Sequence, residues 1–126
     1  MTTQEQGLAA EINVLQNFCH SQAANMGWYT DLKTGEPKVM NKGERLMLIN
    51  SELVEAFEGV RKNLMDDHLP HRKMEEVELA DAVIRIMDYA GYEGMDIGGA
   101  IMEKLIYNRT RADHQLENRI NNGKQF

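Results

Sequence analysis

The sequence predicts a single all-α domain over residues 1–126, with the architecture of a four-helix bundle. Apolar residues recur at the three- and four-residue spacing of amphipathic helices along most of the chain. Alternating runs of β-branched or aromatic residues, the pattern of strands, are absent. The only two prolines, Pro37 and Pro70, fall between the periodic segments. Four such segments can share one core, which is the arrangement of a helix bundle.

The first helix is expected over residues 3–25. Gly27 follows it and is a typical residue for ending a helix. The segment "WYTDLKTGEPKVMNKG", residues 28–43, is predicted to be a loop. The apolar stripe of this helix is expected to comprise Ala9, Ile12, Leu15, Phe18 and Cys19.

The next two helices are expected to form a hairpin. Asn41 followed by Glu44 has the spacing of a capping box, which predicts a helix start there and a helix running to about residue 64. The segment "DDHLPHRK" is predicted to be the turn. The third helix is expected over residues 72–90, ending near Gly91.

The fourth helix is predicted over residues 97–111, with Asp96 as its N-cap. Gly98 and Gly99 near its start weaken the helix and suggest a close helix approach. The polar tail "ENRINNGKQF" is expected to be partly extended.

Charge and composition narrow the function classes. A net charge of −6 and a pI of about 5.2 argue against nonspecific binding to nucleic acid or to anionic membranes. Cys19 is the only cysteine, so no intrachain disulfide can form. The N-terminus lacks the pattern of a signal peptide, and no apolar run approaches the length of a membrane span. These features predict a soluble, cytoplasmic protein.

Two acidic pairs with i,i+3 spacing stand out, Glu52/Glu55 and Glu78/Asp81. In the third helix Glu78 and Asp81 share a narrow stripe with Arg85 and Asp88, while apolar residues occupy the rest of the circumference. We therefore expect this helix to be mostly buried, with its acidic stripe facing a confined polar cavity.

Helices joined by a short turn pack antiparallel, so the four carboxylates of these pairs can converge. Like charges that close repel unless they are neutralised, and carboxylate oxygens suit Mg²⁺ or Mn²⁺. The alternative is a pair of solvated helix faces. A ferritin-like di-iron site needs a histidine three residues after a glutamate, and the chain has none.

A second group of residues has the chemistry to bind phosphate. Lys104, Asn108 and Arg111 recur at i, i+4 and i+7 and would share one helix face. A basic, solvated helix end is the alternative. Trp28 could stack on a base or pack in the core. His20 and Cys19 are more often structural residues in such positions.

These motifs together resemble the MazG-like all-α nucleoside triphosphate pyrophosphatase superfamily. The resemblance comprises E-x-x-E at Glu52–Glu55 and E-x-x-D at Glu78–Asp81 within "EVELADAVIRIMD". "KLIYNRTRADH" followed by "GKQF" looks like that family's closing K-x-x-x-N-x-x-R segment and tail. "GWY" is similar to the aromatic element of its base pocket. The resemblance covers about residues 15–126, and the segment 115–122 lengthens the family's usual tail.

The resemblance implies hydrolysis of a nucleoside triphosphate to a monophosphate and pyrophosphate, with a possible role in cleaning the nucleotide pool. It implies a homodimer or homotetramer whose neighbouring subunits complete the bundle. Mg²⁺, or Mn²⁺, would be held by Glu52, Glu55, Glu78 and Asp81, and Glu52 or Glu55 would serve as the catalytic base. Phosphates would be bound by Lys104, Asn108 and Arg111, and the base by Trp28 and His20.

Two alternatives remain open at this point. The substrate could be another nucleotide, of the phosphoribosyl-nucleotide, dUTP or dCTP type. The chain could also be a nonenzymatic helical interaction module whose acidic stripes are solvated. Metal-dependent thermal stabilisation would distinguish the second alternative from an enzyme.

Overall fold

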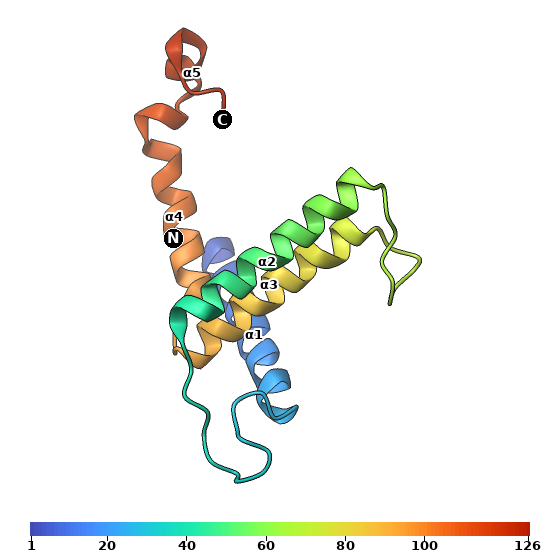
Figure 1. The fold of residues 1–126 in the computed structure, drawn as a ribbon. Helices are drawn as coiled ribbons and strands as arrows, with labels where there is room; N and C mark the ends of the chain where they lie inside the picture. Colours follow the sequence, from blue (N-terminus) through green and yellow to red (C-terminus); the bar gives the residue numbers. More distant parts are fainter. The chain divides into compact units, whose positions relative to one another are not determined.

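A computed structural model describes all 126 residues and confirms the all-α class. The helices are α1 (Thr3–Asn25), α2 (Lys42–Arg61), α3 (Met74–Tyr92), α4 (Ile97–Thr110) and α5 (Leu116–Asn122), with a 3₁₀ turn η1 (Ala112–His114) before α5 (Figure 1). No helix combines the length and the apolar character that crossing a membrane requires.

The chain divides into two compact units, which are described separately. One comprises Met1–Val14 together with Asp96–Phe126, and the other comprises Leu15–Met95. The second unit contains both acidic pairs, so it is the unit that carries the candidate site.

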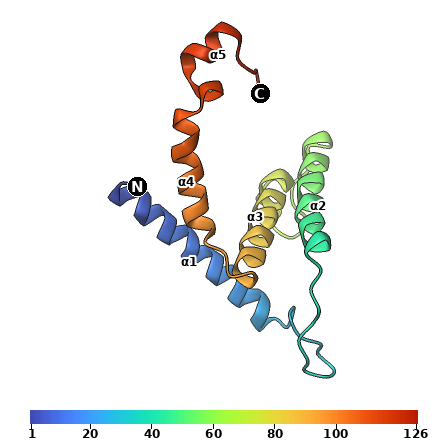
Figure 2. The ribbon, with the colours of Figure 1, turned by 90° about the vertical axis from the view of Figure 1, so that its left-hand side faces the viewer.

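The centre of the unit Leu15–Met95 is the hairpin of α2 and α3, which lie side by side (Figures 1 and 2). Asn41 caps α2 as expected, because its side-chain oxygen accepts a hydrogen bond from the Glu44 amide at 2.9 Å. The helix ends at Arg61, earlier than expected, and Asn63 takes a left-handed φ of 51°. A Cβ at Gly59 would lie 2.9 Å from the Met74 Cβ, so glycine permits the close approach of the two helices there.

A polar and aromatic network ties the loop after α1 to α3. The Tyr29 hydroxyl donates to Asp88 at 2.6 Å, and the His20 Nδ1 lies 3.0 Å from the same carboxylate. Tyr29 also stacks on Tyr92 with ring centroids 4.6 Å apart. The Arg45 guanidinium contacts Asp88 and donates to the Tyr29 hydroxyl. This network fixes where the loop begins, and therefore where Trp28 lies.

The unit formed by the two ends of the chain confirms two expectations about α4. The Asp96 side chain caps the helix by accepting from the Gly99 amide at 2.9 Å. A Cβ at Gly98 would lie 2.1 Å from the Ala9 carbonyl oxygen, so only glycine fits this helix contact. The Asn13 side chain completes the contact, because it accepts from the Gly98 amide at 2.8 Å.

The tail is more helical than expected. Instead of a partly extended segment, it forms η1 and α5. The sequence "LENRINN" contains several good helix formers. In addition, two side-chain amides donate hydrogen bonds to backbone carbonyl groups that precede α5. Gln115 donates to the Arg109 carbonyl, and Asn118 donates to the Ala112 carbonyl at 2.7 Å. These local hydrogen bonds favour a helix where composition alone suggested an extended tail.

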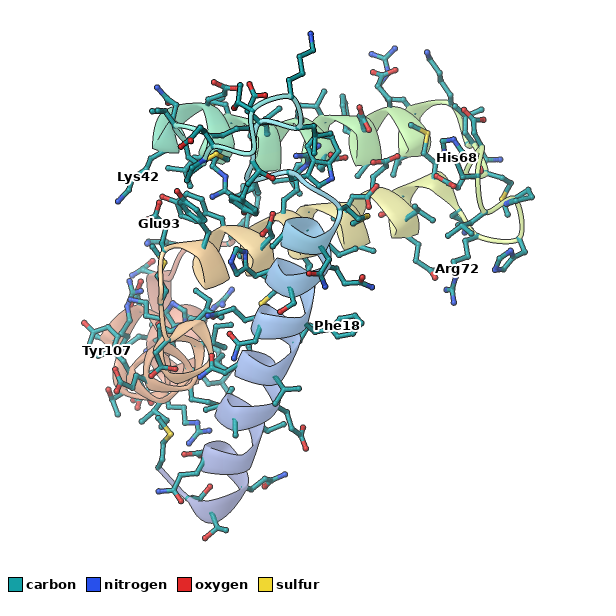
Figure 3. All side chains as sticks on the ribbon, turned by 90° about the horizontal axis from the view of Figure 1, so that it is seen from below. Phe18, Lys42, His68, Arg72, Glu93 and Tyr107 are labelled. Atoms are coloured by element: carbon teal, nitrogen blue, oxygen red, sulfur yellow. The ribbon has the colours of Figure 1, made fainter.

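The expectation that α3 is mostly buried is wrong for the single chain. Its apolar residues Val83, Ile84 and Ile86 are exposed, and on α2 the side chains of Leu53 and Phe57 are exposed as well. The predicted stripe of α1 is also only partly covered: Ala9 and Cys19 are buried and Ile12 is half-buried, whereas Leu15 and Phe18 are exposed, and Phe18 projects away from α1 (Figure 3). The buried hydrophobic residues are mostly small, and no large side chain is fully buried. The hairpin thus buries the two carboxylates of Glu52 and Glu78 and exposes much of its apolar surface.

Candidate active site

Three of the four predicted metal ligands meet between α2 and α3. Glu52 and Glu55 from α2 and Glu78 from α3 each offer a carboxylate oxygen, and these oxygens lie within 4.8 Å of one another. Glu52 is 8 % exposed and Glu78 is 9 % exposed, whereas Glu55 is open to solvent. The i,i+3 spacing on α2 points Glu52 and Glu55 to one side of that helix, and the hairpin brings Glu78 opposite them. The convergence of these three carboxylates was expected from the spacing.

The geometry leaves one buried oxygen without a partner. Glu78 Oε2 is inaccessible to solvent and accepts no hydrogen bond. An unsatisfied carboxylate oxygen in such a place is costly unless a cation or a proton is bound near it. The donor set is entirely carboxylate oxygen, which is the chemistry that Mg²⁺ and Mn²⁺ prefer. The residues present therefore fit a hard divalent cation.

The electrostatics of the cluster agree with a site built for positive charge. Burial, and then the neighbouring Glu52 and Glu55 carboxylates, raise the pKa of Glu78 to about 8. This raised pKa favours the protonated form of Glu78 when no cation is bound. Burial also raises the pKa of Asp81, and the charge of Glu52 adds to that effect. Burial alone would raise the pKa of Glu52, but hydrogen bonds with Arg85 and Glu78 bring it below its usual value.

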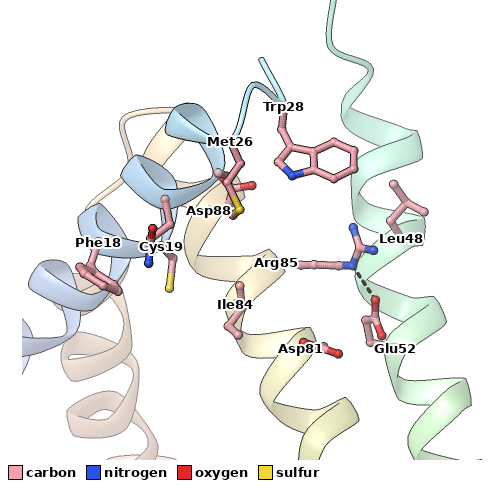
Figure 4. A pocket seen from close by; sticks show the side chains of 12 residues that line it. Phe18, Cys19, Met26, Trp28, Leu48, Glu52, Asp81, Ile84, Arg85 and Asp88 are labelled. Carbon is pink, nitrogen blue, oxygen red and sulfur yellow. Dashed lines mark hydrogen bonds and ion pairs between the residues drawn. The ribbon is translucent and has the colours of Figure 1, made fainter. Parts of the chain in front are cut away.

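Asp81, the fourth predicted ligand, lies outside the group of closest oxygens. It nevertheless lines the same cavity as Glu52 (Figure 4). Asp81 can thus contribute to the charge of the site, and direct ligation by Asp81 stays a prediction.

A cavity of about 650 Å³ lies beside Glu52, the one member of the cluster that lines it. Its volume is in the range of small-molecule sites. Apolar and aromatic residues from the end of α1 and the following loop, among them Met26 and Trp28, line one part of it, and Glu52 and Asp81 line another (Figure 4). Trp28 is 64 % exposed, and the Lys38 Nζ lies 6.0 Å from the centre of its ring. A smaller cavity of about 320 Å³ shares Trp28, Leu48, Arg85 and Asp88 with it.

His20 and Cys19 have different surroundings. His20 belongs to the network around Asp88, with ring contacts to Tyr29 and Tyr92, and it does not line either cavity. Its predicted contact with a base stays a prediction. Cys19 is buried, as expected for a packing residue, and lines the larger cavity.

The predicted phosphate-binding residues belong to the other unit. Lys104 is exposed, with its Nζ 4.8 Å from the centre of the Tyr107 ring. Asn108 is half-buried, and its side-chain oxygen has no hydrogen-bond partner. Arg111 follows the last residue of α4 and is not on its face; it forms two hydrogen bonds with Asp113, at 3.0 and 2.8 Å. Phosphate binding by these three residues stays a prediction.

Sequence reasoning missed two positively charged residues beside the cavities. Arg85 belongs to the acidic stripe and follows Asp81 by one turn, which is the signal in the sequence for a place at the site. Arg45 contacts Asp88 and lies near the rings of Tyr29, Tyr89 and Tyr92. Nothing in the spacing of Arg45 indicated this position.

Comparison of the chain with protein-family models, with curated proteins and with solved structures found no match.

Proposed function

We propose that the chain is a Mg²⁺-dependent nucleoside triphosphate pyrophosphohydrolase of the MazG-like type. The observation that carries the proposal is the cluster of Glu52, Glu55 and Glu78 with its unpartnered buried oxygen, because one member, Glu52, lines the same cavity as Trp28. A cation site beside an aromatic face is what a nucleotide with a charged phosphate chain requires. The motif resemblance in the sequence points to the same reaction.

Glu52, Glu55 and Glu78, with Asp81 nearby, would hold the ion. When bound there, Mg²⁺ would neutralise part of the charge of the triphosphate and of the transition state. The indole of Trp28 would stack on the base. Glu55, the accessible carboxylate of the cluster, would accept a proton from the attacking water. The water oxygen would bond to the α-phosphorus while the bond from that phosphorus to the bridging oxygen breaks, releasing pyrophosphate.

The exposed apolar surface supports assembly as part of the same proposal. Leu53, Phe57, Val83 and Ile84 lie on the hairpin that carries the cluster, and all of them are exposed in the single chain. Large exposed apolar patches mark interfaces. A homodimer with two-fold symmetry, or a homotetramer built from it, would cover this surface.

The same exposed surface favours one second candidate, a nonenzymatic helical interaction module. Such a module would also assemble through its apolar faces, but it would have no use for a divalent cation. An assembled protein with neither hydrolysis nor metal-dependent stabilisation would favour the second candidate.

The test is pyrophosphate release from a panel of ribo- and deoxyribonucleoside triphosphates, with Mg²⁺ and with a chelator. We expect Mg²⁺-dependent release of pyrophosphate from at least one of them, and its loss in Glu55→Gln. Glu58→Gln is the matched control, because Glu58 lies one turn further along α2 and pairs with Arg61 and Lys62. Diphosphate and phosphate as products, or full activity in Glu55→Gln, would contradict the proposal.

A further inference from the structure

Arg85 lies between the two halves of the candidate site. It comes one turn after Asp81 on α3, and its side chain lines both the larger and the smaller cavity. Figure 4 shows it with Trp28 on one side and the Glu52 and Asp81 carboxylates on the other. If the base stacks on Trp28 and the cation binds the carboxylates, the phosphate nearest the sugar must pass Arg85.

The guanidinium of Arg85 is only partly used by the protein. Its Nε donates to Glu52 Oε1 at 2.7 Å, and its two terminal nitrogens make no hydrogen bond. The Arg85 side chain is 44 % exposed, whereas that of Glu52 is 10 % exposed. The arginine is therefore much more accessible to solvent than the carboxylate that it pairs with. The unused donors have the fork geometry that phosphate oxygens match.

The pair has a clear role in the metal-free protein. A buried carboxylate is unfavourable without a positive partner, and Arg85 provides one for Glu52. A divalent cation on Glu52 would supply that charge instead, and it would repel the guanidinium at such close range. Arg85 would then be released with its full charge beside the cavity.

We propose that Arg85 is an exchangeable counter-ion, which leaves Glu52 for a substrate phosphate when a divalent cation binds. This inference rests on the proposed function. It adds that binding of the divalent cation and binding of the phosphate chain are coupled through Arg85. Without nucleotide, Arg85 competes with the cation for Glu52. With the cation bound, Arg85 strengthens the binding of the phosphate chain. A purely structural ion pair would do neither.

The experiment compares wild type and Arg85→Gln in two binding assays. Mn²⁺ binding without nucleotide is followed by the EPR signal of the free ion. Binding of inorganic triphosphate, which carries the phosphate chain without a base, is followed by calorimetry in saturating Mg²⁺. We expect Arg85→Gln to bind Mn²⁺ several-fold more tightly and inorganic triphosphate roughly tenfold to a hundredfold more weakly, the loss typical of one hydrogen bond to a charged group.

Two further variants keep the result interpretable. Arg61→Gln removes an arginine that pairs with Glu58 on α2 at 3.3 Å, away from both cavities, and should leave both affinities unchanged. Arg85→Lys keeps the charge without the fork, so it should bind Mn²⁺ as wild type does and lose part of the triphosphate affinity. If Arg85→Gln fails to fold, Arg85→Lys still tests the inference, because it should keep the Mn²⁺ affinity of wild type and bind triphosphate more weakly.

The outcomes separate this inference from the proposed function. Mn²⁺ binding in Arg85→Gln that is unchanged or weaker, or triphosphate binding that is unchanged, overturns the inference, even if wild type hydrolyses nucleotides. A wild type that binds no Mn²⁺ and releases no pyrophosphate overturns the proposed function and this inference together.

Discussion

Replacing Glu78 by glutamine should make the metal-free protein more stable at high pH, although the replaced residue is buried. The pKa of the Glu78 carboxyl is raised to about 8 in the folded chain, whereas in the unfolded chain it has its ordinary value of 4.5. At a pH between these two pKa values, Glu78 binds more protons in the folded state than in the unfolded state. The free energy of unfolding therefore falls as the pH rises through this window, and the fall ends above the folded pKa. Glutamine resembles the protonated acid at every pH and removes this dependence.

The size of the effect follows from the two pKa values. One pKa unit corresponds to about 1.4 kcal/mol. Between pH 5 and pH 7 Glu78 is mostly protonated in the folded chain and mostly ionised in the unfolded chain. Over this range the free energy of unfolding of wild type should therefore fall by roughly 2 kcal/mol relative to that of Glu78→Gln. Urea unfolding in the presence of a chelator, at a fixed protein concentration and at pH 5, 6, 7 and 8, measures this difference. Glu75→Gln is the control, because Glu75 is exposed on the first turn of α3.

Parallel pH profiles for wild type and Glu78→Gln would contradict this prediction, because they would mean that Glu78 does not hold a proton. The same proton has a second consequence for metal binding. Mg²⁺ binding at pH 7 should release a proton from wild type and none from Glu78→Gln. Calorimetry in buffers of different ionisation enthalpy would measure this release.

Three other predictions concern the metal, the reaction and the fold. Millimolar Mg²⁺ should raise the melting temperature of wild type, and Asp81→Asn should lose most of that rise; an equal rise in Asp81→Asn would remove Asp81 from the site. Hydrolysis in ¹⁸O-labelled water should place the label on the monophosphate, whereas label in pyrophosphate would show attack at the β-phosphorus. Gly98→Ala should cost about 1–3 kcal/mol of stability because its Cβ would meet the Ala9 carbonyl, whereas Gly7→Ala, with open space around it, should not destabilise the protein. Similar melting curves for these two variants would contradict the close helix contact.

The local signals in the sequence were sufficient for the first four helices and for the N-caps of α2 and α4, but not for α5. Asn41 and Asp96 cap the helices that follow them, and Gly27 ends α1 with a left-handed φ of 86°. These features depend on residues within one turn of each other. For the same reason, the two glutamates on α2 could be placed on one side of that helix from spacing alone.

Other features depend on contacts between segments that are distant in the sequence. The spacing of apolar residues on α3 indicated that these side chains are buried. It could not indicate whether the residues that pack on them belong to the same chain. The exposed Ile84 and Ile86 answer that question for the single chain only. The ion pair of Arg85 with Glu52 joins two helices, and the register that brings the residues within 2.7 Å is set by the hairpin as a whole.

The proposed cation site comprises Glu52, Glu55 and Glu78. Its most direct test is a crystal structure of the protein grown with Mn²⁺ and inorganic triphosphate, with data collected for anomalous scattering from manganese. We expect an anomalous peak among these three carboxylates, with the phosphate chain between the peak and Trp28. Fully ordered carboxylates with no peak among them, in crystals of a protein saturated with Mn²⁺, would contradict it.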